Sequence, residues 1–166
     1  MNIKAIETKY DGYRFRSRVE ARWAVFFKAF GATYQYELEG FKLRNGEWYL
    51  PDFFVTGFAE EKRGFYFEVK PFVKPEQVWL DRLEYLSEMV DDTVFLLCGP
   101  PDFRAYQSYA PVDHSFEPEY CWYPVMFSRK GDVRDEYGSE YKGSVSHLLF
   151  TDRYRKAVNA SRAARF

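Results

Sequence analysis

Apolar residues recur at helical spacing in two segments of the chain, residues 17–30 and 75–90. The first apolar stripe consists of Val19, Trp23, Phe26, Phe27 and Phe30. Gly31 follows it and is typical of a helix end. Pro75 suits the first turn of the second helix. The second stripe consists of Trp79, Leu83, Leu86 and Val90. We therefore predict two amphipathic helices.

Short runs of apolar and β-branched residues between and after these helices predict strands. They are Thr33–Glu37, Phe41–Leu43, Glu47–Leu50, Phe53–Val55, Gly64–Val69 and Thr93–Cys98. Asn45-Gly46 is a strong hairpin turn signal, and the strand that returns from it is interrupted at Pro51 and continues over 53–55. The continuous apolar run 93–98 predicts a buried central strand. The order of elements predicts an α/β fold with a mixed central β-sheet flanked by helices.

The length of 166 residues suits one domain, or one domain with an appendage. We place the core at residues 1–100. Residues 101–166 form an aromatic-rich C-terminal extension that we expect to pack on the core. It contains a hairpin that turns near Arg129–Asp132 and a basic terminal helix over 151–165. The high aromatic content of 21% mostly indicates a core built from rings, with some surface rings free to stack on bases.

Three acidic side chains and one lysine occupy informative places in these elements. Glu20 lies at the start of the first helix, and Asp52 follows the strand break. Glu68 and Lys70 are two residues apart on one predicted strand, so their side chains share a face about 7 Å apart along it. Such a strand presents a carboxylate and an ammonium group to one cleft.

This set of residues suits metal-dependent hydrolysis of a phosphodiester bond. Asp52, Glu68 and the backbone carbonyl of Val69 can bind a hard divalent ion, which activates water and polarises a phosphoryl oxygen. Lys70 can orient or deprotonate the attacking water, or stabilise the charge that develops on phosphorus. Glu20 would then be an outer ligand or a ligand of a second metal ion.

Each of these residues also has a purely structural interpretation. Glu68 and Lys70 could be surface charges on a half-exposed strand, and Asp52 a turn residue after proline. Ser17-x-x-Glu20 has the form of a capping box, in which the glutamate closes the helix N-terminus. The two roles of Glu20 are compatible, because a capping position also places its carboxylate at the mouth of the helix.

The order and spacing of these motifs resemble the PD-(D/E)XK nuclease superfamily over about residues 10–98. The matching segments are Phe15-Arg16-Ser17-x-x-Glu20, Tyr34-x-Tyr36-Glu37, Pro51-Asp52-Phe53 and Glu68-x-Lys70. Pro51-Asp52 corresponds to the PD, Glu68-Val69-Lys70 to the ExK, and Glu20 to the helix-borne acid. Within the superfamily, the chain looks most like the phage endonuclease I type of junction-resolving enzyme. Transposon end-cleaving nucleases share parts of the pattern.

The resemblance implies a restriction-endonuclease-like core with the acids at one sheet edge. It implies Glu20, Asp52, Glu68 and Lys70 as catalytic residues, and Asp52, Glu68, Val69 and Glu20 as metal ligands. The ion would be Mg²⁺, with Mn²⁺ as a substitute, and the products a 5′-phosphate and a 3′-hydroxyl. The chain departs from the junction enzymes at Pro71-Phe72, where they usually continue with glycine. It also lacks the glutamine–tyrosine pair of exonuclease-like members.

The net charge of −1 conceals an uneven distribution of charge. Residues 11–30 carry five basic and two acidic side chains, residues 31–100 seven and thirteen, and residues 151–166 five and one. We expect the basic groups to contact phosphates, although solvated or salt-bridged side chains would give the same pattern. The candidate nucleic-acid-binding residues are Tyr13, Arg14, Arg16, Ser17, Arg18, Arg22, Arg155, Arg162 and Arg165.

Cys98 and Cys121 are the only cysteines, and they do not form a C-x-x-C pair. This indicates a reducing compartment and argues against a zinc or iron–sulfur site. Residues 1–10 are polar and unlike a signal peptide, and no apolar stretch approaches membrane-spanning length. We expect a cytoplasmic protein of a bacterial cell or phage-infected host, without a membrane partner.

These observations favour a metal-dependent DNA endonuclease that acts on branched DNA in phage or mobile-element recombination or in repair. A nuclease of linear duplex or of DNA ends is the alternative within the enzyme class. A catalytically silent nucleic-acid-binding module and a structural protein with a chance Glu-x-Lys strand are the alternatives outside it. A homodimer would suit symmetric cutting of two strands, and nothing in the chain decides it.

Overall fold

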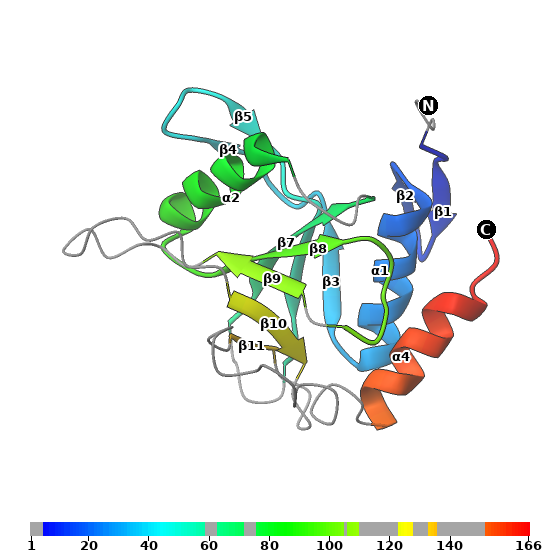
Figure 1. Ribbon diagram of the computed structural model, residues 1–166. Helices are drawn as coiled ribbons and strands as arrows, with labels where there is room; N and C mark the ends of the chain where they lie inside the picture. Colours follow the sequence, from blue (N-terminus) through cyan, green and yellow to red (C-terminus); the bar gives the residue numbers. More distant parts are fainter. Residues whose placement is uncertain are drawn as a thin grey trace.

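The computed structural model contains three helices and a mixed β-sheet in the part of the chain that it describes (Figure 1). The described residues are 5–58, 63–71, 76–104, 106–109, 123–127, 133–135 and 152–166. The helices are α1 (Arg18–Phe30), α2 (Gln77–Val90) and α4 (Asp152–Ala163). All three helices predicted from the sequence are confirmed, and the expected start of the second at Pro75 lies outside the described residues.

Seven of the described strands form one mixed sheet in the order β11-β10-β9-β8-β7-β6-β3. Their bounds are β3 Thr33–Tyr36, β6 Phe53–Thr56, β7 Phe65–Lys70, β8 Val94–Cys98, β9 Tyr106–Tyr109, β10 Tyr123–Phe127 and β11 Val133–Asp135. Neighbouring strands are antiparallel except β7 and β8, which are parallel and are connected through α2. This confirms the expected α/β architecture and mixed sheet. β8 is the middle strand and all five of its residues are buried, as predicted.

The Asn45-Gly46 hairpin is also confirmed. β4 (Phe41–Lys42) and β5 (Trp48–Tyr49) pair antiparallel, and Gly46 adopts the positive φ of 84° that favours glycine in such a turn. The expectation that the returning strand continues over 53–55 was wrong in one respect. β5 stays with β4 in a separate two-stranded sheet, whereas β6 belongs to the main sheet, because the chain changes course at Pro51.

The structure adds elements that the sequence pattern did not indicate. β1 (Thr8–Tyr10) and β2 (Tyr13–Phe15) form an N-terminal hairpin just before α1. β9 extends the sheet from β8. In contrast, the pairing of β10 with β11 confirms the hairpin expected near residues 129–132, although its turn lies outside the described residues. Since β10 also pairs with β9, the described strands after residue 100 continue the sheet that begins with β3.

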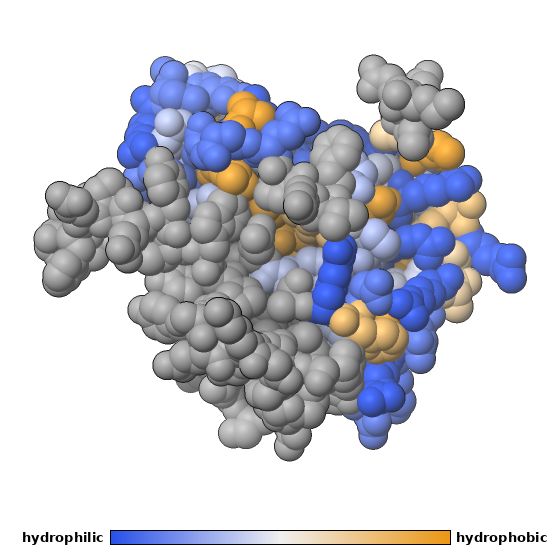
Figure 2. Space-filling view, in the orientation of Figure 1, coloured by the Kyte–Doolittle hydropathy of each residue, from blue (hydrophilic) through white to orange (hydrophobic). Residues whose placement is uncertain are grey.

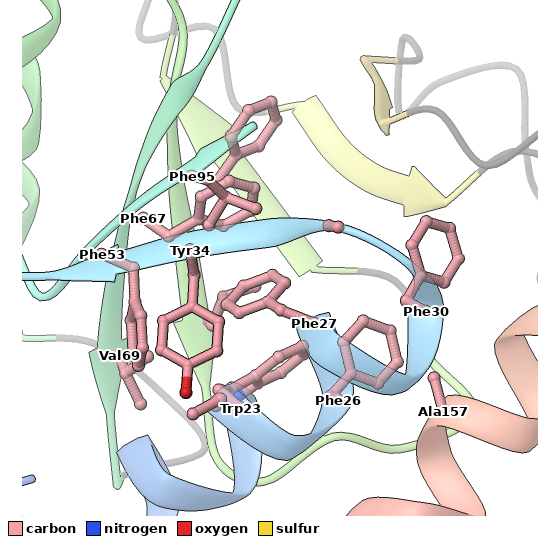
Figure 3. Packing of buried hydrophobic residues seen from close by; sticks show 14 of the residues in the cluster. Trp23, Phe26, Phe27, Phe30, Tyr34, Phe53, Phe67, Val69, Phe95 and Ala157 are labelled. Atoms are coloured by element: carbon pink, nitrogen blue, oxygen red, sulfur yellow. The ribbon is translucent and has the colours of Figure 1, made fainter. Parts of the chain in front are cut away.

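An aromatic core fills the space between one face of the sheet and the helices α1 and α4 (Figure 3). α1 contributes Trp23, Phe26, Phe27 and Phe30, all at most 2% exposed. The sheet contributes alternate residues of β7, because side chains on a strand point to opposite faces. Phe67 of β7 stacks on Phe95 of β8 with ring centroids 4.7 Å apart. Most of the aromatic residues of α1 are thus accounted for by packing.

A second core lies on the opposite face of the sheet, beneath α2 and the β4–β5 hairpin. Leu83 and Leu86 of α2 are fully buried against Leu96 of β8 and Tyr66 of β7. Tyr49 of the hairpin joins the same cluster. The sheet is therefore covered on both faces, and α2 and the hairpin lie on the same side of it (Figure 1).

The described surface seen in Figure 2 is mostly hydrophilic, with hydrophobic residues in small separate patches. Among the described residues, no helix combines the length and the apolar character needed to cross a membrane. The exposed large hydrophobic side chains are Ile6, Leu38, Trp48, Leu50, Val78 and Met89.

Candidate active site

Asp52 and Glu68 face each other where β6 and β7 separate. The strands are antiparallel and pair Phe53 with Phe67, so residue 52 stands opposite residue 68. Because Phe53 and Phe67 enter the aromatic core, the two carboxylates lie on the α2 side of the sheet. Each residue is only 2% exposed. Such burial does not fit the alternative interpretation of Glu68 as a surface charge.

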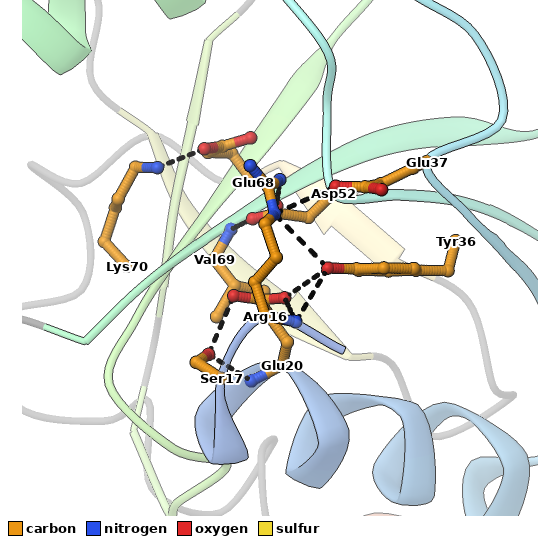
Figure 4. Close-up of polar contacts among 9 residues, drawn as sticks. All are labelled: Arg16, Ser17, Glu20, Tyr36, Glu37, Asp52, Glu68, Val69 and Lys70. Atoms are coloured by element: carbon orange, nitrogen blue, oxygen red, sulfur yellow. Dashed lines mark hydrogen bonds and ion pairs between the residues drawn. The ribbon is translucent and has the colours of Figure 1, made fainter. Parts of the chain in front are cut away.

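Lys70 ends β7 on the same face as Glu68. Its ammonium group forms an ion pair with Glu68 Oε1, as the spacing of two residues predicts (Figure 4). The Lys70 side chain is 12% exposed, so the pair lies at the margin of the buried region. The backbone also fixes this strand end, since Lys70 O accepts a hydrogen bond of 2.6 Å from Gly99 N in the chain just after β8.

The backbone of Val69 points toward the acids. Lys70 O faces β8, and successive peptide groups of a strand alternate in direction, so the N–H and carbonyl of Val69 face the side of β6. Accordingly, Val69 N donates to Asp52 Oδ2 over 2.8 Å. The paired part of the ladder ends at Phe53 and Phe67. If the same register were extended by one more hydrogen-bonded pair, residue 51 would stand opposite Val69, but Pro51 has no N–H to donate to the Val69 carbonyl.

Glu20 lies at the N-terminus of α1, where Ser17 is the N-cap. Glu20 N donates to Ser17 Oγ over 3.2 Å, which confirms the capping interaction predicted from the sequence. The Glu20 carboxylate accepts hydrogen bonds from Ser17 Oγ at 2.7 Å, Arg16 N at 3.0 Å and the Tyr36 hydroxyl at 2.5 Å. Both of its oxygens are thus engaged at the mouth of the helix (Figure 4).

Arg16 joins these groups from the segment between β2 and α1. Its NH2 donates to Asp52 Oδ1 over 2.7 Å, and its Nε lies 2.9 Å from Glu37 Oε1. Arg16 is 57% exposed at the side chain, whereas Asp52 is buried. An exposed cation is therefore paired with a buried carboxylate, and a metal ion at Asp52 would share that carboxylate with Arg16.

The electrostatic state of the site is unfavourable for negative charge. Burial, and then repulsion from Glu68 and Glu20, raise the pKa of Asp52 well above its usual range, although Lys70 and the Val69 N–H act in the opposite direction. Glu68 Oε2 is buried without a hydrogen-bond partner among the described residues. A buried carboxylate oxygen in this condition is suited to accept an added cation or donor.

Tyr49 of β5 borders the same region and was not among the residues predicted from the sequence. Its hydroxyl is buried and unpartnered among the described residues. Burial, and then the charges of Glu68 and Asp52, raise the pKa of Tyr49 well above its usual range, so it remains a protonated donor. No local signal indicated this residue, because its approach to Glu68 depends on how the β4–β5 hairpin folds against the sheet.

The donor set suits one ion held by few protein ligands. Within the described residues, no three histidine, cysteine, aspartate or glutamate side chains are grouped so that they could hold a metal. The candidate ligands are instead two carboxylates, those of Asp52 and Glu68, and one backbone oxygen, that of Val69. The Glu20 carboxylate is hydrogen-bonded to Ser17 and Tyr36. Mg²⁺ typically binds one or two carboxylates and keeps several waters or substrate oxygens. The residues present therefore fit Mg²⁺ better than a closed protein cage.

The basic residues predicted at the start of α1 fall into two groups. Arg14 and Arg18 are exposed, and Arg14 pairs with Glu7, itself largely exposed. Arg22 instead donates to Ser161 O of α4, which links the two helices. Tyr13 packs against the rings of Tyr34 and Tyr36 and has a structural role whatever else it contacts.

The basic residues predicted on α4 are exposed as expected. Arg155 lies on the solvent side of α4, and Arg162 pairs with Asp102 in the segment after β8 over 2.5 Å. The helix ends at Ala163, before Arg165, which is also exposed. The opposite side of α4 buries Tyr154, Ala157 and Val158. The helix thus packs through one face and presents basic groups on the other.

No protein-family model matches this chain, and comparison with curated proteins finds no relative of significant similarity. The resemblance of its motifs to the PD-(D/E)XK superfamily therefore rests on the residues themselves.

Proposed function

We propose that this chain is a divalent-metal-dependent endonuclease that hydrolyses phosphodiester bonds in DNA. The observation that carries the proposal is the pair of buried carboxylates, Asp52 and Glu68, with Lys70 on the same strand face. Two acids buried together with a raised Asp52 pKa are costly to the fold. Such an arrangement is typical of sites where a cation completes the charge balance.

When bound, the metal ion would activate water and polarise a phosphoryl oxygen. Asp52 and Glu68 would hold it, together with the Val69 carbonyl, to which Pro51 cannot donate a hydrogen bond. Lys70 is placed to orient the attacking water or to stabilise the negative charge that develops on the phosphate oxygens. Glu20 fixes the start of α1 and the Tyr36 hydroxyl, and so it positions the wall of the site.

The DNA backbone would approach along the start of α1. Arg14, Arg16 and Arg18 are exposed there, and Arg16 pairs with the buried Asp52. A helix N-terminus also favours phosphate, because its first N–H groups and the helix dipole present positive charge. When a phosphate enters, it offers Arg16 an alternative partner to Asp52, which would release that carboxylate to the metal ion.

The substrate class follows from the motif resemblance. We propose branched DNA, as in phage or mobile-element recombination or in repair, with linear duplex or DNA ends as the alternative. A catalytically silent DNA-binding module is a second candidate. It is favoured by one observation, which is that Arg16 and Val69 already occupy both oxygens of Asp52.

A cleavage assay tests the enzyme. The protein is incubated with a four-way junction, linear duplex or single-stranded DNA, in Mg²⁺, Mn²⁺, Ca²⁺ or EDTA. We expect cleavage with Mg²⁺ or Mn²⁺ only, and the preferred DNA identifies the subclass. Glu68→Gln and Lys70→Met should each lower the cleavage rate by about 10²–10⁴-fold, since they remove a metal ligand and a group that acts on the reacting oxygens.

Two positions outside the candidate site provide matched controls. Glu88→Gln and Lys42→Met make the same chemical changes on the surface of α2 and of β4, away from the acids. They should leave the rate unchanged. Binding of DNA without cleavage under every metal would support the silent module instead. Cleavage that persists in Glu68→Gln at the wild-type rate would contradict the assigned site.

A further inference from the structure

Trp79 of α2 contacts the candidate catalytic lysine directly. The Lys70 ammonium nitrogen lies 3.7 Å from the centroid of the Trp79 ring, well within the range of a cation–π interaction. Lys70 also pairs with Glu68. The ammonium group therefore has two attractive partners, a carboxylate on its own strand and an indole ring on the helix above it.

A second cation holds the same ring. The guanidinium carbon of Arg82 lies 4.5 Å from the Trp79 ring centroid. Arg82 is anchored in turn by Glu47, at the turn of the β4–β5 hairpin, through a 2.5 Å contact with NH2 and a 3.2 Å bond from Nε. Trp79 is also partly buried against the core beneath α2. The ring is thus fixed by packing and by a charged pair.

We propose that Trp79 is a positioning residue for Lys70. Its ring keeps the ammonium group beside Glu68 and out of solvent, and Glu47 and Arg82 keep the ring in place. The attraction of the ring does not depend on the Glu68 carboxylate. It therefore still holds the ammonium group in the site when that carboxylate is shared with another cation. The catalytic consequence of this placement rests on the endonuclease function proposed above.

The placement is tested without activity by NMR on protein labelled with ¹³C-lysine. A proton held over an indole ring is shifted upfield by the ring current, so the Lys70 ε-methylene signal should be shifted upfield in the wild type. Lys70→Arg identifies that signal by its loss. Trp79→Leu should return it to the ordinary lysine position. The matched control is Trp48→Leu, which removes an exposed tryptophan of β5 and should leave the signal in place.

The consequence for catalysis is tested by single-turnover cleavage with saturating Mg²⁺ and DNA. Trp79→Leu should cut about tenfold more slowly, with Trp79→Phe intermediate, and with DNA and metal affinity unchanged. Fluorinated tryptophans placed at position 79 weaken the negative ring face at nearly constant volume. The rate should fall stepwise with added fluorine, which a merely structural role of the ring would not produce. Thermal unfolding verifies that each variant is folded.

The outcomes separate the two proposals. An upfield lysine signal that Trp79→Leu abolishes, together with the graded rates, supports the positioning role. Wild-type protein that does not cut any DNA contradicts the endonuclease, while the NMR signal still decides whether Trp79 holds Lys70. A wild-type Lys70 signal at the ordinary position overturns the placement. Rates that are insensitive to fluorination overturn the catalytic consequence.

Discussion

Asp52 is subject to opposing effects on the ionisation of its carboxyl group. Its carboxylate accepts hydrogen bonds from Arg16 and Val69, which favour the ionised form. Burial and the neighbouring carboxylates disfavour that form more strongly, and the pKa of Asp52 is raised as a result. The fold therefore carries a carboxylate that costs stability at neutral pH, as residues retained for function often do.

We predict that Asp52→Asn stabilises the protein when divalent ions are absent. The amide cannot ionise, so Tm at pH 7 should rise by about 2–4 °C, or about 1 kcal/mol. The direction in which stability changes with pH follows from the raised pKa of Asp52. Between the ordinary carboxyl pKa and the raised value, folded Asp52 keeps a proton that the unfolded chain releases, so this residue's contribution to stability falls as pH rises through that window.

Thermal unfolding in EDTA at several pH values between about 5 and 8 measures this difference. The gap between variant and wild type should widen as pH rises. Mg²⁺ at 100 times its Kd should then stabilise the wild type by about 2.7 kcal/mol and the variant by less. Glu88→Gln, which removes a partly buried charge from an ion pair with Arg44, serves as the control. A lower Tm for Asp52→Asn at every pH would contradict the prediction.

At the scale of elements, the sequence predicted the helices and strands that are determined by local signals. Helix α1 was found because its N-cap Ser17 and its terminal Gly31 lie next to its own apolar stripe. Strand β7 was found because Phe65, Phe67 and Val69 alternate along it and share the face that packs on the aromatic core. The three-residue strands β1 and β2 carry too few residues for such a pattern and depend on pairing with each other.

The site was predicted less completely than the fold around it. The four residues Glu20, Asp52, Glu68 and Lys70 were named from their order in the chain, and the burial of both sheet carboxylates agrees with a common site. The pairing of Arg16 with Asp52 was not anticipated, because the two residues are 36 positions apart and meet only through the sheet. Trp79 was assigned to the apolar stripe of α2, although its ring also contacts Lys70.

Pro51 gives a prediction about the end of the β6–β7 ladder. Pro51→Ala supplies an N–H at position 51, which an extension of the ladder beyond Phe53 and Phe67 would direct at the Val69 carbonyl. We expect Mg²⁺ to bind about tenfold more weakly, because the carbonyl becomes a poorer ligand. Isothermal titration with Mg²⁺ measures this. Pro100→Ala, at an exposed proline after β8, is the control. Unchanged Mg²⁺ affinity in Pro51→Ala would argue against Val69 as a ligand.

At the scale of the whole molecule, α1 links the candidate site to the far end of the described chain. Its N-terminus carries Ser17 and Glu20, and its apolar face packs against α4. Tyr154 of α4 is fully buried, with its ring centroid 5.4 Å from that of Phe26 and its hydroxyl donating to Asp102 O. The site therefore depends on a helix whose packing is completed by residues more than a hundred positions away.

We predict that Tyr154→Ala lowers the free energy of unfolding by about 3–5 kcal/mol, because it leaves a cavity between α1 and α4. Tyr154→Phe should cost about 1 kcal/mol, which is the loss of one hydrogen bond. Urea denaturation followed by tryptophan fluorescence measures both. The exposed neighbour Lys156→Ala should stay within about 0.5 kcal/mol of the wild type. Wild-type stability of Tyr154→Ala would mean that α4 does not support α1.

The packing of α4 on α1 also has a consequence for the protein during its synthesis. About 120 residues separate the two helices in the chain. At about 5–20 residues per second, a ribosome needs roughly 6–24 s to synthesise them after α1. During that interval, Phe26 and Phe30 have no cover from α4, and the newborn chain offers an aromatic surface to chaperones. The core around α1 is therefore completed only after α4 has been made.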